Sequence, residues 1–230
     1  MIKEIINVFK KHSLMDQSYE RTYEMIDIAF NMYKEIQTRL RENAKYQFSF
    51  NILDQDIAIN KYEREVRRNV FNHLCVSGMD DLTSGLVLVS IIIDIERVGD
   101  YIKNMVELAE GIDKVLKGGK FEDDLVKVEK AVEDSFKQVR DILERADDKK
   151  AENLLLEYKW VNKICDKQVN ELLNEKDNKI SSGKAVALAL YFRYLKRINS
   201  HLRNVASSVV NPFPRIGFRM KKQKDSSEKE

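Results

Sequence analysis

Residues 95–104 read IERVGDYIKN, and residues 195–204 read LKRINSHLRN. The two stretches align without a gap at an offset of one hundred positions, so that Arg97 corresponds to Arg197. Each stretch belongs to a longer segment in which apolar residues recur at helical spacing. This similarity predicts that the chain is an internal duplication of one α-helical unit.

The use of proline also favours long helices. Both prolines, Pro212 and Pro214, lie near the C-terminus, so no proline interrupts the chain before them. The stretch GLVLVSIIID at residues 85–94 is rich in β-branched residues and, taken alone, resembles a buried strand. Its apolar pattern passes at helical spacing into Val98 and Ile102, and a lone strand would have no partner. We therefore predict a central buried helix at this position.

Turn residues between the apolar segments define the expected organisation. Gly118 and Gly119 break the chain, and a plan of three helices joined by turns precedes and follows them. The predicted fold class is therefore all-α, with two tandem three-helix bundles. Six helices are expected, at about residues 13–45, 54–77, 80–111, 122–146, 150–174 and 182–210. The expected parts are an amphipathic leader, a first bundle, a second bundle and a basic, disordered tail, at residues 1–12, 13–112, 120–211 and 212–230.

Composition and charge exclude several classes of protein. The net charge of +2 comes from 40 basic and 38 acidic residues, which give no overall field able to hold a nucleic-acid backbone. Cys75 and Cys165 are far apart and no secretory signal opens the chain, which favours a reducing compartment. The longest nearly apolar run, residues 86–93, is far shorter than the roughly 20 residues that span a bilayer. We therefore expect a cytoplasmic protein without a nucleic-acid partner.

One set of polar residues could carry chemistry. Glu96 and Asp100 stand four residues apart on the predicted third helix, and Asp56, Asn60 and Glu63 form a similar ladder on the second. Antiparallel packing of these two helices would bring the two ladders together. Carboxylate and amide oxygens without His or Cys suit hard or borderline cations such as iron, manganese, magnesium or calcium.

An ordinary solvated polar face is the alternative interpretation of these ladders. Arg97 and Lys103 could neutralise the carboxylates as surface ion pairs, each of which contributes little to stability. The second copy of the repeat differs, because Lys196 and Ser200 replace the acidic residues of the first copy. We therefore expect no metal in the second bundle, where Lys196 would act as a built-in positive charge.

Two motifs resemble a known family. The stretch ERVGDYIKNMVELAE at residues 96–110 is similar to ERIGDHAxNIAE, a pattern of the PhoU family, and DIAINKYE at residues 56–63 is similar to its pattern DxxINxLE. The chain resembles this family over about residues 14–210. The resemblance implies tandem three-helix bundles and a multinuclear cluster of iron, zinc, manganese or magnesium in the first bundle only. The positions that match the metal-binding faces of the family are Asp56, Asn60, Glu63, Glu96 and Asp100.

The resemblance also implies a function and a set of partners. It implies a regulator of phosphate uptake and phosphate homeostasis that acts through the ATPase subunit of a phosphate ABC transporter, through a membrane sensor histidine kinase, or through both. A homodimer stays open as a further assembly. The chain contains no GxSxG motif and no phosphate-cradling glycine loop, so we expect no enzymatic activity.

Two rival functions stay open at this stage. One is a metal-free helical adaptor of a phosphate transporter or another membrane complex. The other is a hydrolase or metal-storage protein built on the carboxylate face. The absence of paired Glu-x-x-His motifs from the sequence argues against the second rival.

Both ends of the chain carry features of membrane-surface segments. The leader MIKEIINVFKKH at residues 1–12 places four apolar residues on one helical side and contains three lysines. The tail between Arg215 and Lys224 carries five basic residues. One interpretation is peripheral contact of both ends with the inner face of the membrane or with a membrane-bound partner. The interpretation that we favour is a leader packed on its own bundle and a solvated tail.

Overall fold

The computed structural model describes residues 13–77, 79–174 and 179–218, and all regular secondary structure within these ranges is helical. The predicted all-α fold class of two three-helix bundles is confirmed. The predicted leader at residues 1–12 lies outside the described residues. The α-helices are α2 (Leu14–Arg41), α3 (Ile52–Ser77), α4 (Leu82–Glu110), α5 (Glu122–Arg145), α6 (Asp148–Glu157), α7 (Trp160–Leu173) and α8 (Ser182–Val210), with short 3-10 turns at Gly119–Phe121 and Phe213–Arg215.

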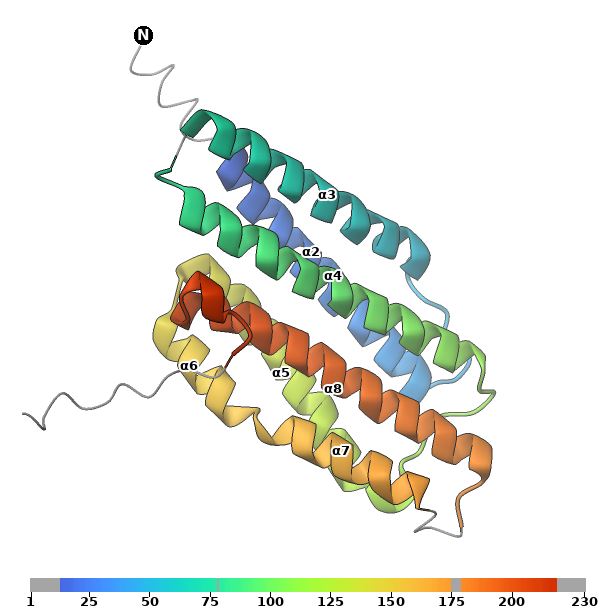
Figure 1. The fold of residues 1–230 in the computed structure, drawn as a ribbon. Helices are drawn as coiled ribbons and strands as arrows, with labels where there is room; N and C mark the ends of the chain where they lie inside the picture. Colours follow the sequence, from blue (N-terminus) through green and yellow to red (C-terminus); the bar gives the residue numbers. More distant parts are fainter. Residues whose placement is uncertain (1–12, 78, 175–178, 219–230) are drawn as a thin grey trace, which may run out of the picture.

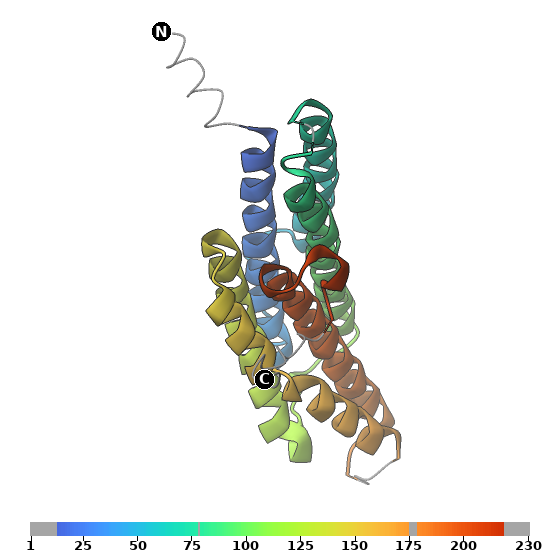
Figure 2. The same cartoon turned by 60° about the vertical axis from the view of Figure 1, so that its left-hand side comes forward.

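The two bundles pack side by side along their third helices. Helices α2, α3 and α4 form the first bundle, and α5, α8 and the pair α6 and α7 form the second (Figure 1). Helices α4 and α8 run antiparallel at the centre, and α2 also contacts α5 (Figures 1 and 2). The hydrophobic core is continuous across both bundles. The duplicated sequences of α4 and α8 therefore meet at the junction of the two copies.

The β-branched stretch at residues 85–94 is helical, as predicted. It belongs to α4, which is in contact with α2, α3 and α8. Ile91, Ile92 and Ile95 are almost completely buried, because a helix with neighbours on several sides can cover apolar residues around most of its circumference. The surrounding helices override the intrinsic strand preference of this stretch.

The predicted fifth helix consists of two helices. Helix α6 ends at Glu157 and α7 begins at Trp160, with Tyr158 and Lys159 between them. Tyr158 has φ −95° and ψ 17°, outside the helical region, although the sequence here has no Gly or Pro to announce a break. Both α6 and α7 pack on α8, so the break lets the two short helices follow the same partner helix.

A buried polar group joins the C-terminal end of α2 to the second bundle. Nε of Arg41 lies 2.8 Å from Oε1 of Glu129 on α5, and both side chains are nearly buried. The hydroxyl of Tyr191 donates to the same carboxylate oxygen at 2.7 Å, and the hydroxyl of Tyr33 donates to the carbonyl of Glu129. Burial of Glu129 raises its pKa, while the Arg41 charge counteracts that effect.

Residues 212–218, which the sequence assigns to the disordered tail, fold back on the end of α8. The side chain of Asn211 donates to the carbonyls of Arg215 and Phe218, and the amide of Gly217 donates to Oγ of Ser207 at 2.7 Å. Pro212 opens the short 3-10 turn that makes this reversal. The rest of the predicted tail, residues 219–230, lies outside the described residues.

Within the described part of the chain, no helix combines the length and the apolar character needed to cross a membrane.

Candidate functional site

The residues predicted to form a metal site lie together at the contact between α3 and α4. The close approach of these helices depends on Gly99, because a Cβ atom there would come within 3.1 Å of Cδ1 of Ile59 and within 3.9 Å of Oδ1 of Asp56. Asp56 is buried beside α4, and Glu96 is largely buried across from it. The antiparallel packing expected from the sequence is therefore what brings the two ladders together.

The negative charges of neighbouring carboxylates on this face affect the pKa of Glu96. Burial raises the pKa of Glu96, and the negative charge of Asp100 raises it further. Glu63 and Asp56, on the neighbouring helix, add smaller effects in the same direction. Predicted residues from both helices thus share one electrostatic environment, which we name the acidic face: Asp56, Asn60, Glu63, Glu96 and Asp100.

Basic side chains already neutralise most of the acidic face. Nζ of Lys103 lies 3.3 Å from Oδ2 of Asp56 and 3.6 Å from Oδ1 of Asp100, so its ammonium group bridges α3 and α4. Nη1 of Arg97 lies 3.0 Å from Oδ2 of Asp100. Arg67 forms an ion pair with Glu63, at 2.7 Å.

As arranged, the acidic face does not form a metal-binding geometry. In the described ranges of the chain, no three His, Cys, Asp or Glu side chains converge so that they could hold a metal ion. Asn60 donates its amide nitrogen to the carbonyl of Asp56, at 3.0 Å, so that only its side-chain oxygen could ligate a cation. Lys103 thus occupies the position between two carboxylates that a cation would need. The metal site stays a prediction, with Lys103 as the competitor of the metal.

The counterpart of the acidic face in the second bundle carries the opposite pattern of charge. Nζ of Lys196 on α8 lies 2.5 and 2.7 Å from the two carboxylate oxygens of Asp166 on α7. Ser200 exchanges hydrogen bonds with the side chain of Asn162, also on α7. An ammonium group therefore stands where the first copy of the repeat has Glu96, and a hydroxyl where it has Asp100.

A polar cluster that the sequence did not suggest links the two bundles. Oδ1 of Asp94 on α4 lies 2.7 Å from Nδ1 of His201 and 3.0 Å from Nδ2 of Asn204, both on α8. The ring of His201 stacks on Tyr101, whose hydroxyl accepts a hydrogen bond from Nε of Arg197. All of these residues except Asn204 border a cavity of about 470 Å³. The antiparallel pairing of α4 with α8 brings the residues of this cluster together. The spacing of residues within either copy of the repeat does not predict the cluster.

These features define a class of protein: all-α chains built of two tandem three-helix bundles, with an acidic face between the second and third helices of the first bundle. The PhoU domain family matches residues 1–109 and 125–209, and the chain belongs to the PhoU family.

Two solved structures have the same fold. The crystal structure of PhoU from Pseudomonas aeruginosa superposes with a TM-score of 0.77 at 18% identity, over 88% of this chain and 97% of that one. The phosphate transport system regulatory protein PhoU from Streptococcus pneumoniae gives 0.71 at 14% identity, over 85% and 93%. No curated protein sequence matches the chain. At these identities, the two structures support the fold alone.

The electrostatics of Glu96 lead to a pH-dependent prediction. Glu96→Gln is expected to raise the free energy of unfolding at neutral pH by about 0.2–0.5 kcal/mol, the range for like charges one helical turn apart. The raised pKa means that folded Glu96 binds its proton more tightly than the unfolded chain does, so the carboxylate lowers stability as the pH rises above the ordinary glutamate value of about 4.3. The gain should therefore disappear below that pH.

Urea unfolding in the presence of a chelator, at neutral pH and at about pH 3.5, measures this effect. Glu63→Gln is the matched control, because Glu63 has a closer ion pair, at 2.7 Å from Arg67, than Glu96 has with Arg97, at 3.6 Å, so its removal should not stabilise the chain. An equal gain for Glu96→Gln at both pH values would contradict the assignment.

Proposed function

We propose that this chain is a non-catalytic regulator of phosphate uptake and phosphate homeostasis, located in the cytoplasm and acting through protein partners. The observation that carries the proposal is the family match over both halves of the chain. One of the structures with the same fold is named a phosphate transport system regulatory protein. The sequence contains no nucleophile motif and no phosphate-binding glycine loop, which also supports a regulatory role.

The proposed partners are the ATPase subunit of a phosphate ABC transporter and a membrane sensor histidine kinase. The outer side of α3 supports a role in protein binding. Phe71 is 68% exposed and lies on the same helical side as the exposed Ile57. Arg64 and Arg68, on that side too, form no ion pair with any described residue. Aromatic and arginine side chains are enriched at the centres of protein interfaces, so this side, which we name the α3 stripe, is the proposed partner surface.

A metal-free adaptor is the second candidate function. The observation that favours it is the ion-pair bridge of Lys103 across the acidic face, which balances carboxylates that a metal would otherwise balance. Both candidates act through protein contacts, and they differ in whether the first bundle binds a metal.

Loss of the gene in its host is expected to release phosphate uptake from control. When phosphate is plentiful, the deletion strain should take up labelled phosphate faster than its parent, and the unaltered gene should restore the parental rate. A copy carrying Arg68→Ala and Phe71→Ala should fail to restore it, because truncation of central interface residues commonly costs 2 kcal/mol or more of binding energy, roughly thirtyfold in affinity.

The matched control is Val126→Ala, which truncates an exposed apolar side chain on α5, and it should restore the parental rate. Circular dichroism of both purified variants checks that they fold. Unchanged uptake in the deletion strain would contradict the regulatory function. Full restoration by the double variant would contradict the role of the α3 stripe and leave the function itself intact.

A further inference from the structure

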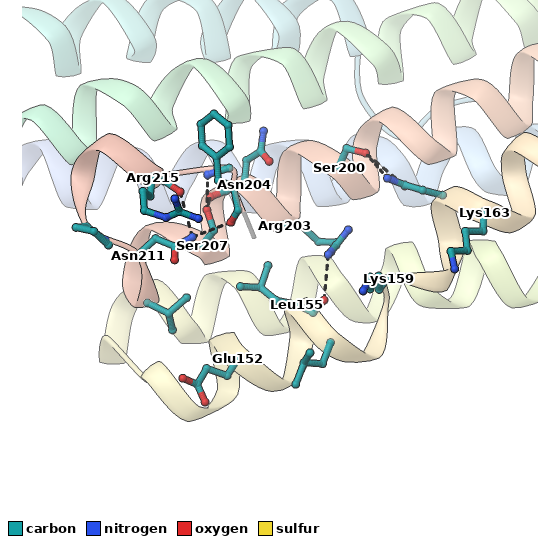
Figure 3. Close-up of a pocket in the computed structure, with 16 residues that line it drawn as sticks. Glu152, Leu155, Lys159, Lys163, Ser200, Arg203, Asn204, Ser207, Asn211 and Arg215 are labelled. Atoms are coloured by element: carbon teal, nitrogen blue, oxygen red, sulfur yellow. Dashed lines mark hydrogen bonds between the residues drawn. The ribbon is translucent and has the colours of Figure 1, made fainter. Parts of the chain in front are cut away.

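A large groove lies in the second bundle, away from the acidic face. It has a volume of about 1240 Å³ and runs between the region around the break from α6 to α7 and the C-terminal half of α8 (Figure 3). The segment that folds back after α8 contributes Gly217 and Phe218 to its lining. The groove is larger than many small-molecule sites, which commonly measure about 300–1,000 Å³.

The helix break builds one wall of this groove. The chain leaves helical geometry at Tyr158, whose N–H still donates to the carbonyl of Leu154, and the last carbonyls of a helix generally need partners from outside the helix. Nη2 of Arg203 on α8 donates to one of these carbonyls, that of Leu155, at 3.0 Å. Arg203 thus holds the end of α6 against α8, and a cation near a helix C-terminus is also favoured by the helix dipole.

Positive charge dominates the lining. Lys159 and Lys163 come from the break and from α7, Arg203 comes from α8, and Arg215 comes from the segment that follows, whereas Glu152 is the single carboxylate of the lining. Figure 3 shows Lys159, Lys163 and Arg203 along the same stretch of the groove. None of these three forms an ion pair with a described residue.

Arg203 has hydrogen-bonding capacity that the described residues leave unused. Its Nε atom is buried and has no hydrogen-bond partner among them. Burial lowers the pKa of the guanidinium, and no carboxylate offsets that effect. An unpaired buried donor on a cation lowers stability, so an anion bound beside Arg203 would relieve that cost.

We propose that this groove binds a phosphate-bearing organic molecule of about nucleotide size. The phosphate would lie beside Arg203, Lys159 and Lys163, whose guanidinium and ammonium groups match a multiply charged oxyanion. Leu156 and Phe218 offer apolar surface for the organic part of the ligand. The inference does not depend on the regulatory function proposed above.

The divergence of the two repeat copies supports an anion at this place. Lys196 and Ser200 replace the acidic pair of the first copy, and Ser200 itself lines the groove with Asn162. The second copy therefore presents hydroxyl and amide groups beside the cations where carboxylates would repel an anion. The duplication has produced one acidic face and one basic groove.

Isothermal titration of the full chain tests the proposal, in low salt and with a chelator so that metal cannot bridge the ligand. ATP is the probe, adenosine is the uncharged counterpart, and inorganic phosphate separates recognition of the phosphate alone from recognition of the whole molecule. ATP is expected to bind once per chain, more weakly as salt rises, and adenosine should not bind. Binding of inorganic phosphate as tight as that of ATP would overturn the organic part of the proposal.

The decisive variant is Lys159→Gln with Lys163→Gln, because both side chains are exposed and unpaired, so the fold should not depend on them. It should weaken ATP binding about tenfold or more, since two charge-assisted contacts are lost. Lys127→Gln with Lys130→Gln removes two exposed lysines of α5 that lie outside the groove, and it should leave binding unchanged.

Three results would overturn the proposal: no saturable binding of ATP, an equal loss in the two double variants, or tighter binding of poly-glutamate than of ATP at the same lysines. The last result would identify the groove as a site for an acidic polypeptide. Arg203→Lys provides an independent check, because it keeps the charge and loses the planar donor. It should weaken ATP binding while α-helical content stays unchanged.

Discussion

Replacing Arg41 with methionine is expected to lower the free energy of unfolding by about 3–5 kcal/mol, the cost of breaking a buried ion pair by removing one partner. Glu129, which is only 5% exposed, would keep its charge and lose its closest cation. Arg41 also contacts the carboxylate of Glu122 and the carbonyl of Leu116, so the substitution would loosen the connection between the bundles as well. Chemical unfolding at neutral pH measures the loss.

The companion variant separates buried charge from lost packing. Arg41→Met combined with Glu129→Gln should recover about 2 kcal/mol or more, because the amide removes the uncompensated charge and its oxygen can still accept from Tyr191. Arg140→Met is the matched control, since Arg140 reaches Asp27 of the first bundle through an exposed contact and should cost less than about 1 kcal/mol. Equal losses for Arg41→Met and Arg140→Met would contradict a special role of the buried pair.

The pH dependence gives a second measurement on the same variant. The charge of Arg41 lowers the pKa of Glu129 in the folded chain, so its removal should raise that pKa further above the ordinary value. A raised carboxylate pKa makes the folded state relatively more stable as the pH falls. The destabilisation by Arg41→Met should therefore shrink as the pH is lowered and Glu129 takes up a proton.

The helices could be predicted because their signals are local. Apolar spacing and the positions of Gly and Pro predict the segments, and the repeat at residues 95–104 and 195–204 predicts the tandem bundles. The break at Tyr158 has no local signal, because the sequence there contains ordinary helix-compatible residues. The hydrogen bond from Arg203 on α8 to the carbonyl of Leu155 on α6 is one contact between helices at this break. Such contacts between distant segments cannot be predicted from the sequence of the broken segment alone.

The sequence also predicted which residues form the acidic face, but not how their side chains are paired. Spacing places each ladder on one face of its helix, and a short connection makes the two helices antiparallel, so the two ladders are expected at the same helix contact. The position of Lys103 between these carboxylates depends on side-chain geometry that spacing does not fix. The basic groove combines residues from α6, α7, α8 and the segment beyond, so no single stretch of sequence reveals it.

Replacing Lys103 with methionine is expected to convert the acidic face into a tighter divalent-metal site. The substitution removes the ammonium group between Asp56 and Asp100, and Glu96 lies in the same electrostatic environment. A hard divalent cation with oxygen ligands would then relieve the repulsion that Lys103 now balances. Titration with Mn²⁺ should show at least about tenfold tighter binding to Lys103→Met than to the unaltered chain, a difference of about 1.4 kcal/mol.

Two further variants decide whether the metal binds at the acidic face. Glu96→Ala with Asp100→Ala, added to Lys103→Met, should abolish the gain, whereas Lys196→Met should create no site in the second bundle, where Asp166 has no carboxylate partner on α8. Elemental analysis after dialysis gives the number of ions per chain independently of the titration. If Lys103→Met binds Mn²⁺ no more tightly than the unaltered chain does, Lys103 does not compete with a metal. If neither the unaltered chain nor Lys103→Met binds Mn²⁺, the metal-free adaptor is favoured. In that case the ion pairs of Lys103, and no metal, balance the charge of the acidic face.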